Sequence, residues 1–310
     1  MMKTGKKLVG LMLCFTLTAG CLFGCGGTSA NDEEILTSAV KSINEAKNFD
    51  MVGKTSGKMV MKMGGQSQEM DMSSEVKGTQ FADPLKAKVT GVTKTAGTSV
   101  ETESYVQKED DKYVVYVKAA GTWSKMVLGD LDQAISASGM NSIEKQLKED
   151  VSKYTKKDDR EVDGKDYLVY EYTVSGEEIK EMMAGVSSSL GSIMGGQSGD
   201  MEQLLNDMVK DIGDMPMTIL FDRESKSIYQ IEYSMTEMMN KMMKSVMESI
   251  SKMSGEDAGQ GLSDLSIEVS DMNMVITYSN IGSAADFEIP EEALSAKEMD
   301  LGDAQEESKE

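Results

Sequence analysis

The chain has 310 residues, 3 cysteines, no histidine and a formal net charge of −21. The missing histidine excludes Ser-His-Asp and Cys-His catalysis as well as histidine-based metal sites. The acidic charge argues against nucleic acid as a partner and against electrostatic binding to an anionic membrane. The length is sufficient for one large domain or two small ones.

An apolar run from Leu8 to Cys25 follows Lys3, Lys6 and Lys7. Basic residues before about fifteen apolar residues, with small residues at the far end, are typical of a secretory signal peptide. A transmembrane helix needs about twenty apolar residues, so that interpretation is weaker. We therefore expect residues 1–24 to be a signal peptide.

Two cysteines near the end of this run each follow a glycine. The stretches Leu22-Phe23-Gly24-Cys25 and Thr18-Ala19-Gly20-Cys21 both resemble the lipobox of bacterial lipoproteins. The resemblance implies a diacylglyceryl anchor on one thiol and a place on the extracytoplasmic face of the cell membrane. We favour Cys25, because residues 25–34 then make a flexible, glycine-containing tether; Cys21 is the alternative. A signal peptide whose cysteines are only small apolar residues remains a third interpretation.

After the tether, Asn31 or Asp32 can cap a helix whose apolar residues recur at helical spacing as far as Ala46. From Phe49 the period changes to two, which indicates strands. Methionines alternate with polar residues on both sides of a Gly64-Gly65 turn, so this hairpin should have one methionine-lined face. That face would carry Met59, Met61, Met63, Met70 and Met72.

Alternating patterns predict further strands, and tight turns with no helix between them imply antiparallel pairing. The predicted strands cover residues 85–95, 99–108, 113–117, 159–162, 167–174, 217–221, 227–235 and 265–278. The last of these places Met272 and Met274 in register. Asp163-Gly164 is the strongest turn signal, because both positions of a type I′ turn need positive φ.

Helical spacing recurs in three places, at 130–154, at 177–212 around a Ser/Gly-rich loop, and at 238–253. The last helix has one broad apolar face that includes Met239, Met242 and Met243. Packing against the sheet is the simpler interpretation of this face, and a groove for a lipid or a partner helix is the alternative. Residues 291–310 are acidic and should form a solvated, disordered tail.

Methionine is unusually frequent, with 28 Met against 6 Phe and 1 Trp. Flexible thioether side chains suit either a soft core or an adaptable apolar binding surface. Compositional bias with ordinary core packing is the simpler explanation, so methionine content by itself does not establish a ligand.

Searches for chemical motifs give no catalytic signature. The chain lacks both the P-loop and the Gly-x-Gly-x-x-Gly pattern. Residues 158–164 resemble a calcium loop only superficially, because Arg160 stands at a ligand position. We therefore predict a protein that is not an enzyme, with no cofactor and no metal site.

Several stretches together resemble a group of Gram-positive lipoproteins of unassigned function. They are Glu33–Leu36 with the following helix up to Met51, Val162–Lys165 with its tyrosine-rich strand, Ser270–Tyr278, and Ile289–Ala293. That group is similar to the LolA/LppX/LprG class. The resemblance implies an α+β fold for residues 35–290, in which a curved antiparallel β-sheet (half-barrel) has helices packed on its concave face. The class encloses an apolar cavity for acyl chains, which the helices at 177–212 and 238–253 would fill if they packed inside.

Two functional hypotheses follow from these patterns. In the first, a membrane-anchored lipoprotein binds or carries a lipid-like or other apolar ligand between sheet and helices. The residues expected to face the ligand are the methionines Met59, Met61, Met63, Met70, Met72, Met239, Met242, Met243, Met272 and Met274. In the alternative, the protein is a non-enzymatic cell-surface interaction or envelope-sensing domain with a closed core. A transporter's solute-binding protein would need two lobes of alternating strands and helices, which the pattern lacks.

Overall fold

A computed structural model describes residues 30–109, 112–119, 121–128, 147, 150–181, 212–253 and 266–299. The predicted signal peptide, both candidate lipidated cysteines, and most of the helices expected at 130–154 and 177–212 lie outside these residues. So does the chain beyond residue 299. What the sequence predicts for these segments therefore stays a prediction.

The described chain is mostly β-structure and forms one open sheet of 13 strands. Its long central strands are β1 (Asn48–Met63), β2 (Gln66–Ala82), β3 (Leu85–Thr95), β4 (Thr98–Glu109) and β12 (Ser266–Ser279). The shorter strands are β5 (Lys112–Ala119), β6 (Thr122–Leu128), β7 (Thr155–Lys156), β8 (Arg160–Val162), β9 (Lys165–Val174), β10 (Met215–Asp222), β11 (Ser227–Ser234) and β13 (Lys297–Glu298).

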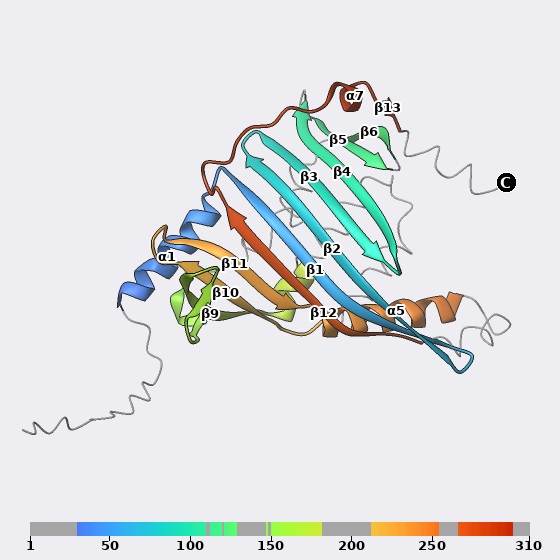
Figure 1. The fold of residues 1–310 in the computed structure, drawn as a ribbon, viewed down its shortest axis with the longest axis horizontal. Coiled ribbons are helices and arrows are strands. Elements are labelled where there is room, and N and C mark those ends of the chain that lie inside the picture. Colours follow the sequence, from blue (N-terminus) through green and yellow to red (C-terminus); the bar gives the residue numbers. More distant parts are fainter. Residues whose placement is uncertain are drawn as a thin grey trace, which may run out of the picture.

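The strand order is β13-β6-β5-β4-β3-β2-β1-β12-β11-β10-β9-β7, with β8 paired to β9 (Figure 1). Every pairing is antiparallel except that of β13 with β6. The meander expected from the sequence is confirmed, and the predicted strands agree with the observed ones to within about two residues. β6 is not predicted by the sequence pattern, because its seven residues alternate weakly beside a stretch that reads as helical.

The turn between β8 and β9 follows the sequence signal. Val162 pairs with Lys165 across the turn, and Asp163 and Gly164 have φ values of 52° and 78°. Both central residues therefore adopt the left-handed conformation that a two-residue hairpin requires.

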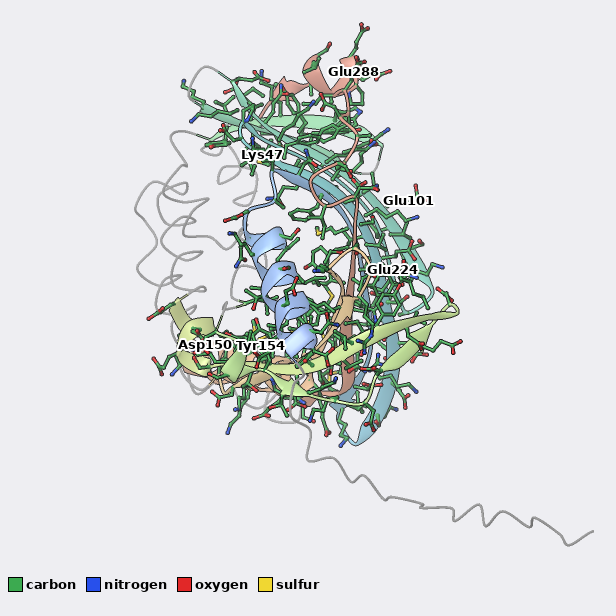
Figure 2. The ribbon with its side chains drawn as sticks, turned by 90° about the vertical axis from the view of Figure 1, so that its left-hand side faces the viewer. Lys47, Glu101, Asp150, Tyr154, Glu224 and Glu288 are labelled. Atoms are coloured by element: carbon green, nitrogen blue, oxygen red, sulfur yellow. The ribbon has the colours of Figure 1, made fainter. Side chains whose placement is uncertain are left out.

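Helix α1 (Ala30–Asn44) lies inside the curve of the sheet (Figure 2). Its apolar residues are buried against strands β9, β10, β11 and β12. The helix residues in this core are Ile35, Leu36, Ala39, Val40 and Ile43. The expected fold class, a curved antiparallel sheet with helices on its concave face, is confirmed.

The start of α1 differs from the expected cap. The helix already begins at Ala30, so Asn31 and Asp32 lie in its first turn. Asp32 is only 4% exposed, and its carboxylate accepts hydrogen bonds from Lys156 and from Arg223, the latter at 3.3 Å. The hydrogen bond with Asp32 is the main reason that the pKa of Lys156 is raised. Asp32 therefore fastens the helix to β7 and to the β10–β11 turn, because a carboxylate beside two cations is stabilised more there than at a solvated helix end.

Two further helices lie at the margins of the sheet. Helix α5 (Thr236–Met253) packs against β12 near the end of the sheet where β1 turns into β2 (Figure 1). Helix α7 (Glu291–Leu294) is a single turn on the opposite, convex face. No helix among the described residues is long and apolar enough to cross a membrane.

The described chain after β12 crosses the convex face and reaches β6. Phe287 contacts Phe81 and Tyr105 with ring centroids 6.1 and 5.9 Å apart, and Ala293 is fully buried beside Tyr105. Residues 297 and 298 then pair with β6. The ordered chain therefore extends past Pro290, where we expected it to end. The reason is that Ala293 packs into the aromatic cluster and that residues 297 and 298 add a short strand to the sheet.

Candidate functional site

The strand register places most of the predicted methionines on one face of the sheet. Met59 lies opposite Met70, and Gly57 lies opposite both Met72 on β2 and Met272 on β12. Residues directly opposite each other in antiparallel strands project from the same face. On the same face of β1, Phe49 and Met51 pack in the core around α1. The methionines therefore lie on the concave face.

Glycines of neighbouring strands make room for these methionine side chains. A Cβ atom added to Gly78 would lie 3.0 Å from the Cε atom of Met51, and one added to Gly57 would lie 3.2 Å from that of Met272. At Gly53 the corresponding distance, to the Cε atom of Met274, is 3.6 Å. In the middle of the concave face, methionine side chains thus lie over glycine backbone.

The predicted residues are not all equally enclosed. Met59, Met61, Met70, Met72 and Met274 are half-buried. In contrast, Met272 is only 5% exposed, and Met63, beside the turn, is 59% exposed. The structure therefore brings Met59, Met70, Met72 and Met272 together around Gly57, while Met63 extends beyond the group.

Helix α5 is fixed to the edge of β12 where β11 has already ended. The Thr236 hydroxyl accepts a hydrogen bond from the Met272 N–H at 2.8 Å. The Asn240 amide accepts from the Val269 N–H and donates to its carbonyl, both at 2.7 Å. These two side chains make the backbone hydrogen bonds to β12 that a neighbouring strand would otherwise make. The predicted residues Met239, Met242 and Met243 are half-buried on this helix.

A hollow of about 590 Å³ lies where α5 approaches the beginning of β10. Ile212, Met215 and Met238 are among its apolar walls, and Lys241 and Lys244 are among its polar ones. The helical spacing indicated the broad apolar face of α5 but not the role of its lysines. Lys241 and Lys244 line this hollow because α5 lies beside the beginning of β10, and helical spacing does not encode that contact.

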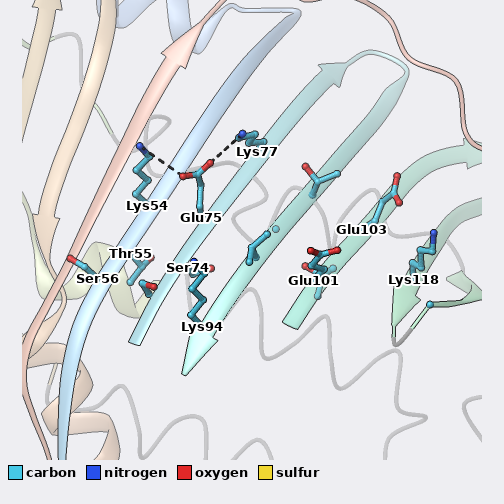
Figure 3. Close-up of a pocket in the computed structure, with 16 residues that line it drawn as sticks. Lys54, Thr55, Ser56, Ser74, Glu75, Lys77, Lys94, Glu101, Glu103 and Lys118 are labelled. Atoms are coloured by element: carbon cyan, nitrogen blue, oxygen red, sulfur yellow. Dashed lines mark ion pairs between the residues drawn. The ribbon is translucent and has the colours of Figure 1, made fainter. Parts of the chain in front are cut away.

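A larger hollow, of about 870 Å³, lies over β1 to β5 and has a different chemical character (Figure 3). Charged side chains line it, including Glu75, which lies 3.9 Å from Lys54 and 3.2 Å from Lys77. These residues alternate with the concave-face residues and belong to the convex face. Exposed ion pairs of this kind contribute about 0–1 kcal/mol each, and they keep the convex face of the sheet solvated.

Titratable groups in the described chain form structural pairs. Tyr116 donates a hydrogen bond to Glu109 at 2.8 Å, and burial followed by this bond raises the pKa of the tyrosine to about 12. Within the described residues, no group of three or more His, Cys, Asp or Glu side chains is placed to hold a metal ion. The distinctive chemistry of the concave face is therefore that of thioethers.

Comparison with known proteins identifies the family of this chain. The sequence profile of a family of unknown function, DUF6612, matches residues 31–298, and the chain belongs to this family. A search of curated proteins gave no match.

Solved structures similar to this chain include several lipoproteins. Lipoprotein LppX of Mycobacterium tuberculosis is 11% identical, with 83% of this chain and 97% of that chain covered, at a TM-score of 0.40. LprF of Mycobacterium bovis is 13% identical, with 86% and 100% covered, at a TM-score of 0.41. An outer membrane lipoprotein-sorting protein domain from Vibrio parahaemolyticus is 11% identical, with 80% and 89% covered, at a TM-score of 0.18. These matches include an LppX lipoprotein and a lipoprotein-sorting domain, as the resemblance noted in the sequence led us to expect.

Proposed function

We propose that the protein is a membrane-anchored extracytoplasmic lipoprotein that binds a lipid-like or other apolar ligand between the concave face and the helices. The observation that carries this proposal is the group of half-buried methionines lying over glycines in the middle of that face. A flexible apolar surface with few polar groups suits acyl chains, which demand apolar area and little hydrogen bonding. Each CH₂ group transferred from water contributes about 0.8 kcal/mol.

The proposed anchor is a diacylglyceryl group on Cys25, with Cys21 as the alternative. Helix α1 begins at Ala30, so only residues 26–29 would separate a lipidated Cys25 from the helix. An extended chain spans at most about 3.6 Å per residue, so the helix would start within about 18 Å of the anchor. The tether is therefore shorter than the expected 25–34, and the α1 end of the domain would face the membrane.

The test uses the full chain with Cys21 and Cys25 replaced by alanine, so that no acyl chain is attached covalently. Native mass spectrometry and organic extraction would detect any lipid that is purified with the protein. Titration with a pyrene-labelled fatty acid would then measure uptake. We expect a bound lipid or stoichiometric uptake of the fatty acid.

A matched pair of variants locates the ligand on one face. Met72→Lys places a charge on the concave face, and Ser73→Lys places the same charge on the convex face of the same strand. We expect Met72→Lys to lose fatty acid uptake while Ser73→Lys keeps it, with circular dichroism confirming that both variants fold. Equal uptake by the two variants, or a clean mass without uptake by the parent chain, would overturn the proposal.

The alternative, an interaction or envelope-sensing domain with a closed core, is favoured by one observation. The core around α1 is fully packed, and Leu36, Ala39 and Val40 have no exposed surface. A parent chain that takes up no fatty acid would support this second function.

A further inference from the structure

Strand pairing brings four methionines to one part of the concave face. Met70 lies directly opposite Met59, and Gly57 separates Met72 from Met272 in the adjacent row. Cβ atoms of directly opposite residues lie about 4.5–5.5 Å apart, and diagonal neighbours about 7–8 Å. Because methionine has three rotatable side-chain bonds, the sulfur atoms of Met59, Met70 and Met72 are within reach of a common point, and Met272 borders these residues across Gly57.

Gly57 is the reason that the group can converge. Any side chain at this position would stand between Met72 and Met272. Instead, the Met272 side chain extends over the glycine, with its Cε atom 3.2 Å from the place where a Cβ would be. Met59, Met70 and Met72 are half-buried beside this glycine, so a small solute can reach their side chains.

The neighbouring Met274 has a different role. The Thr55 hydroxyl donates a hydrogen bond to its sulfur atom at 2.9 Å. This bond holds the Met274 side chain beside Thr55, one row away from Gly57, and it occupies a lone pair of the sulfur. Met274 therefore lies outside the group of four and serves as an internal control.

Thioether sulfur is a soft, uncharged ligand that favours Cu(I) over harder cations. No histidine is present in the chain, and the 3 cysteines all lie within the first 25 residues. The net charge of −21 attracts cations toward the protein. A soft ion that reached this face would therefore meet thioether ligands without competition from imidazole.

We propose that Met59, Met70, Met72 and Met272 form a binding site for one soft monovalent cation, Cu(I) or Ag(I), beside Gly57. The site takes the cation through three or four sulfur atoms and involves no change in oxidation state.

The test is a competition experiment on the full chain with Cys14, Cys21 and Cys25 replaced by alanine, because cysteine thiolates would otherwise bind the metal. Cu(I) is titrated without oxygen against the chromophoric chelator bathocuproine disulfonate, and Ag(I) binding is followed by native mass spectrometry. We expect one ion per chain. Loss of an outer-shell partner alone costs about 10- to 100-fold in metal affinity, so the triple variant Met59→Leu, Met70→Leu, Met72→Leu should lose at least about 100-fold.

Control variants separate the site from the general methionine content. Met51→Leu and Met274→Leu remove thioethers from the same face outside the group, and we expect both to retain the Cu(I) affinity of the parent chain. Equal affinity in the parent and the triple variant, or no competition with the chelator by the parent, would overturn the proposal.

A spectroscopic measurement on the parent chain keeps the test decisive if the triple variant does not fold. Ag(I) is added to protein labelled with ¹³C at the methionine ε-methyl groups, whose signals are assigned from single leucine variants. We expect the signals of Met59, Met70, Met72 and Met272 to shift and that of Met274 to stay. Shifts confined to other methionines would refute the site.

This inference does not rest on the proposed lipid binding. Leucine keeps the apolar surface that an acyl chain needs but provides no sulfur ligand. The triple leucine variant should therefore lose Cu(I) affinity whether or not the parent chain takes up the pyrene-labelled fatty acid. A chain that binds no fatty acid but withholds Cu(I) from the chelator would remove the lipid proposal alone.

Discussion

Strand β1 contributes to two different regions of the same concave face. Near its start, Phe49 packs edge-to-face on Tyr278 with ring centroids 5.8 Å apart, and both rings are almost fully buried in the α1 core. Further along, the same face consists of Gly53, Thr55, Gly57 and Met59, flanked by other methionines. The strand is continuous, yet its side chains change from rigid and bulky to small or flexible.

This difference shows how one sheet combines a closed core with an adaptable surface. Aromatic and branched side chains have few rotamers and pack well where a helix holds a fixed position against them. A methionine side chain adapts its shape, so a change in a residue packed against it costs less stability. Substitutions in the two regions should therefore have very different effects on stability.

The largest effect is expected in the region covered by α1. Leu36 is fully buried there, so Leu36→Ala should lower the free energy of unfolding by about 2–5 kcal/mol. The neighbouring Thr37 is exposed, and Thr37→Ala should change stability by no more than about 0.5 kcal/mol. Urea denaturation followed by circular dichroism would measure both. Similar stabilities for the two variants would show that α1 does not form the core.

A smaller effect is expected from adding one methyl group to either of two glycines of the methionine-lined region. A Cβ at Gly57 would lie 2.9 Å from the Asp271 carbonyl oxygen, so Gly57→Ala should cost about 1–3 kcal/mol through overpacking. A Cβ at Gly53 meets its nearest atom only at 3.6 Å, so Gly53→Ala should be neutral or stabilising by up to about 1 kcal/mol. Thermal unfolding of both variants tests this. Equal losses would mean that this face is packed as tightly as the α1 core.

The smallest effect is an acid sensitivity at the β10–β11 turn, outside both of these regions. Burial tends to raise the pKa of Asp222, but hydrogen bonds from Lys165, at 2.7 Å, and from the N–H groups of Glu224 and Ser225 outweigh it and lower the pKa below 3.8. A lowered folded-state pKa contributes stability that is present above the unfolded value and is lost as the pH falls through the folded value.

The matching measurement compares the parent chain with Asp222→Asn between about pH 5 and pH 2. We expect the parent to lose more stability than the variant across this interval, since the asparagine has no charge to lose. Parallel curves for the two proteins would contradict the lowered pKa. Methionine-face variants should leave the pH dependence unchanged.

Much of the fold could be predicted from the sequence because it depends on local patterns. Alternation with a period of two located most strands, and the helical spacing of Ile35 to Ala46 located α1. The Asp163-Gly164 pair identified its turn because few other residues tolerate positive φ at both positions. The aromatic cluster under the C-terminal segment was missed, since Phe287 and Tyr105 are far apart in sequence.

The candidate site was predicted only in part, for the same reason. By itself the sequence determined that Met59, Met70 and Met72 share one face of a hairpin, because side chains of a strand alternate between its two faces. Only the tertiary structure decided that β12 pairs with β1, which places Met272 beside Gly57 and leaves Met63 exposed. Likewise, the sequence indicated Asp32 as a possible helix cap. Its burial beside Lys156 and Arg223 depends on segments more than a hundred residues away. Pairing between distant strands is set by how the whole core packs, and no local pattern encodes it.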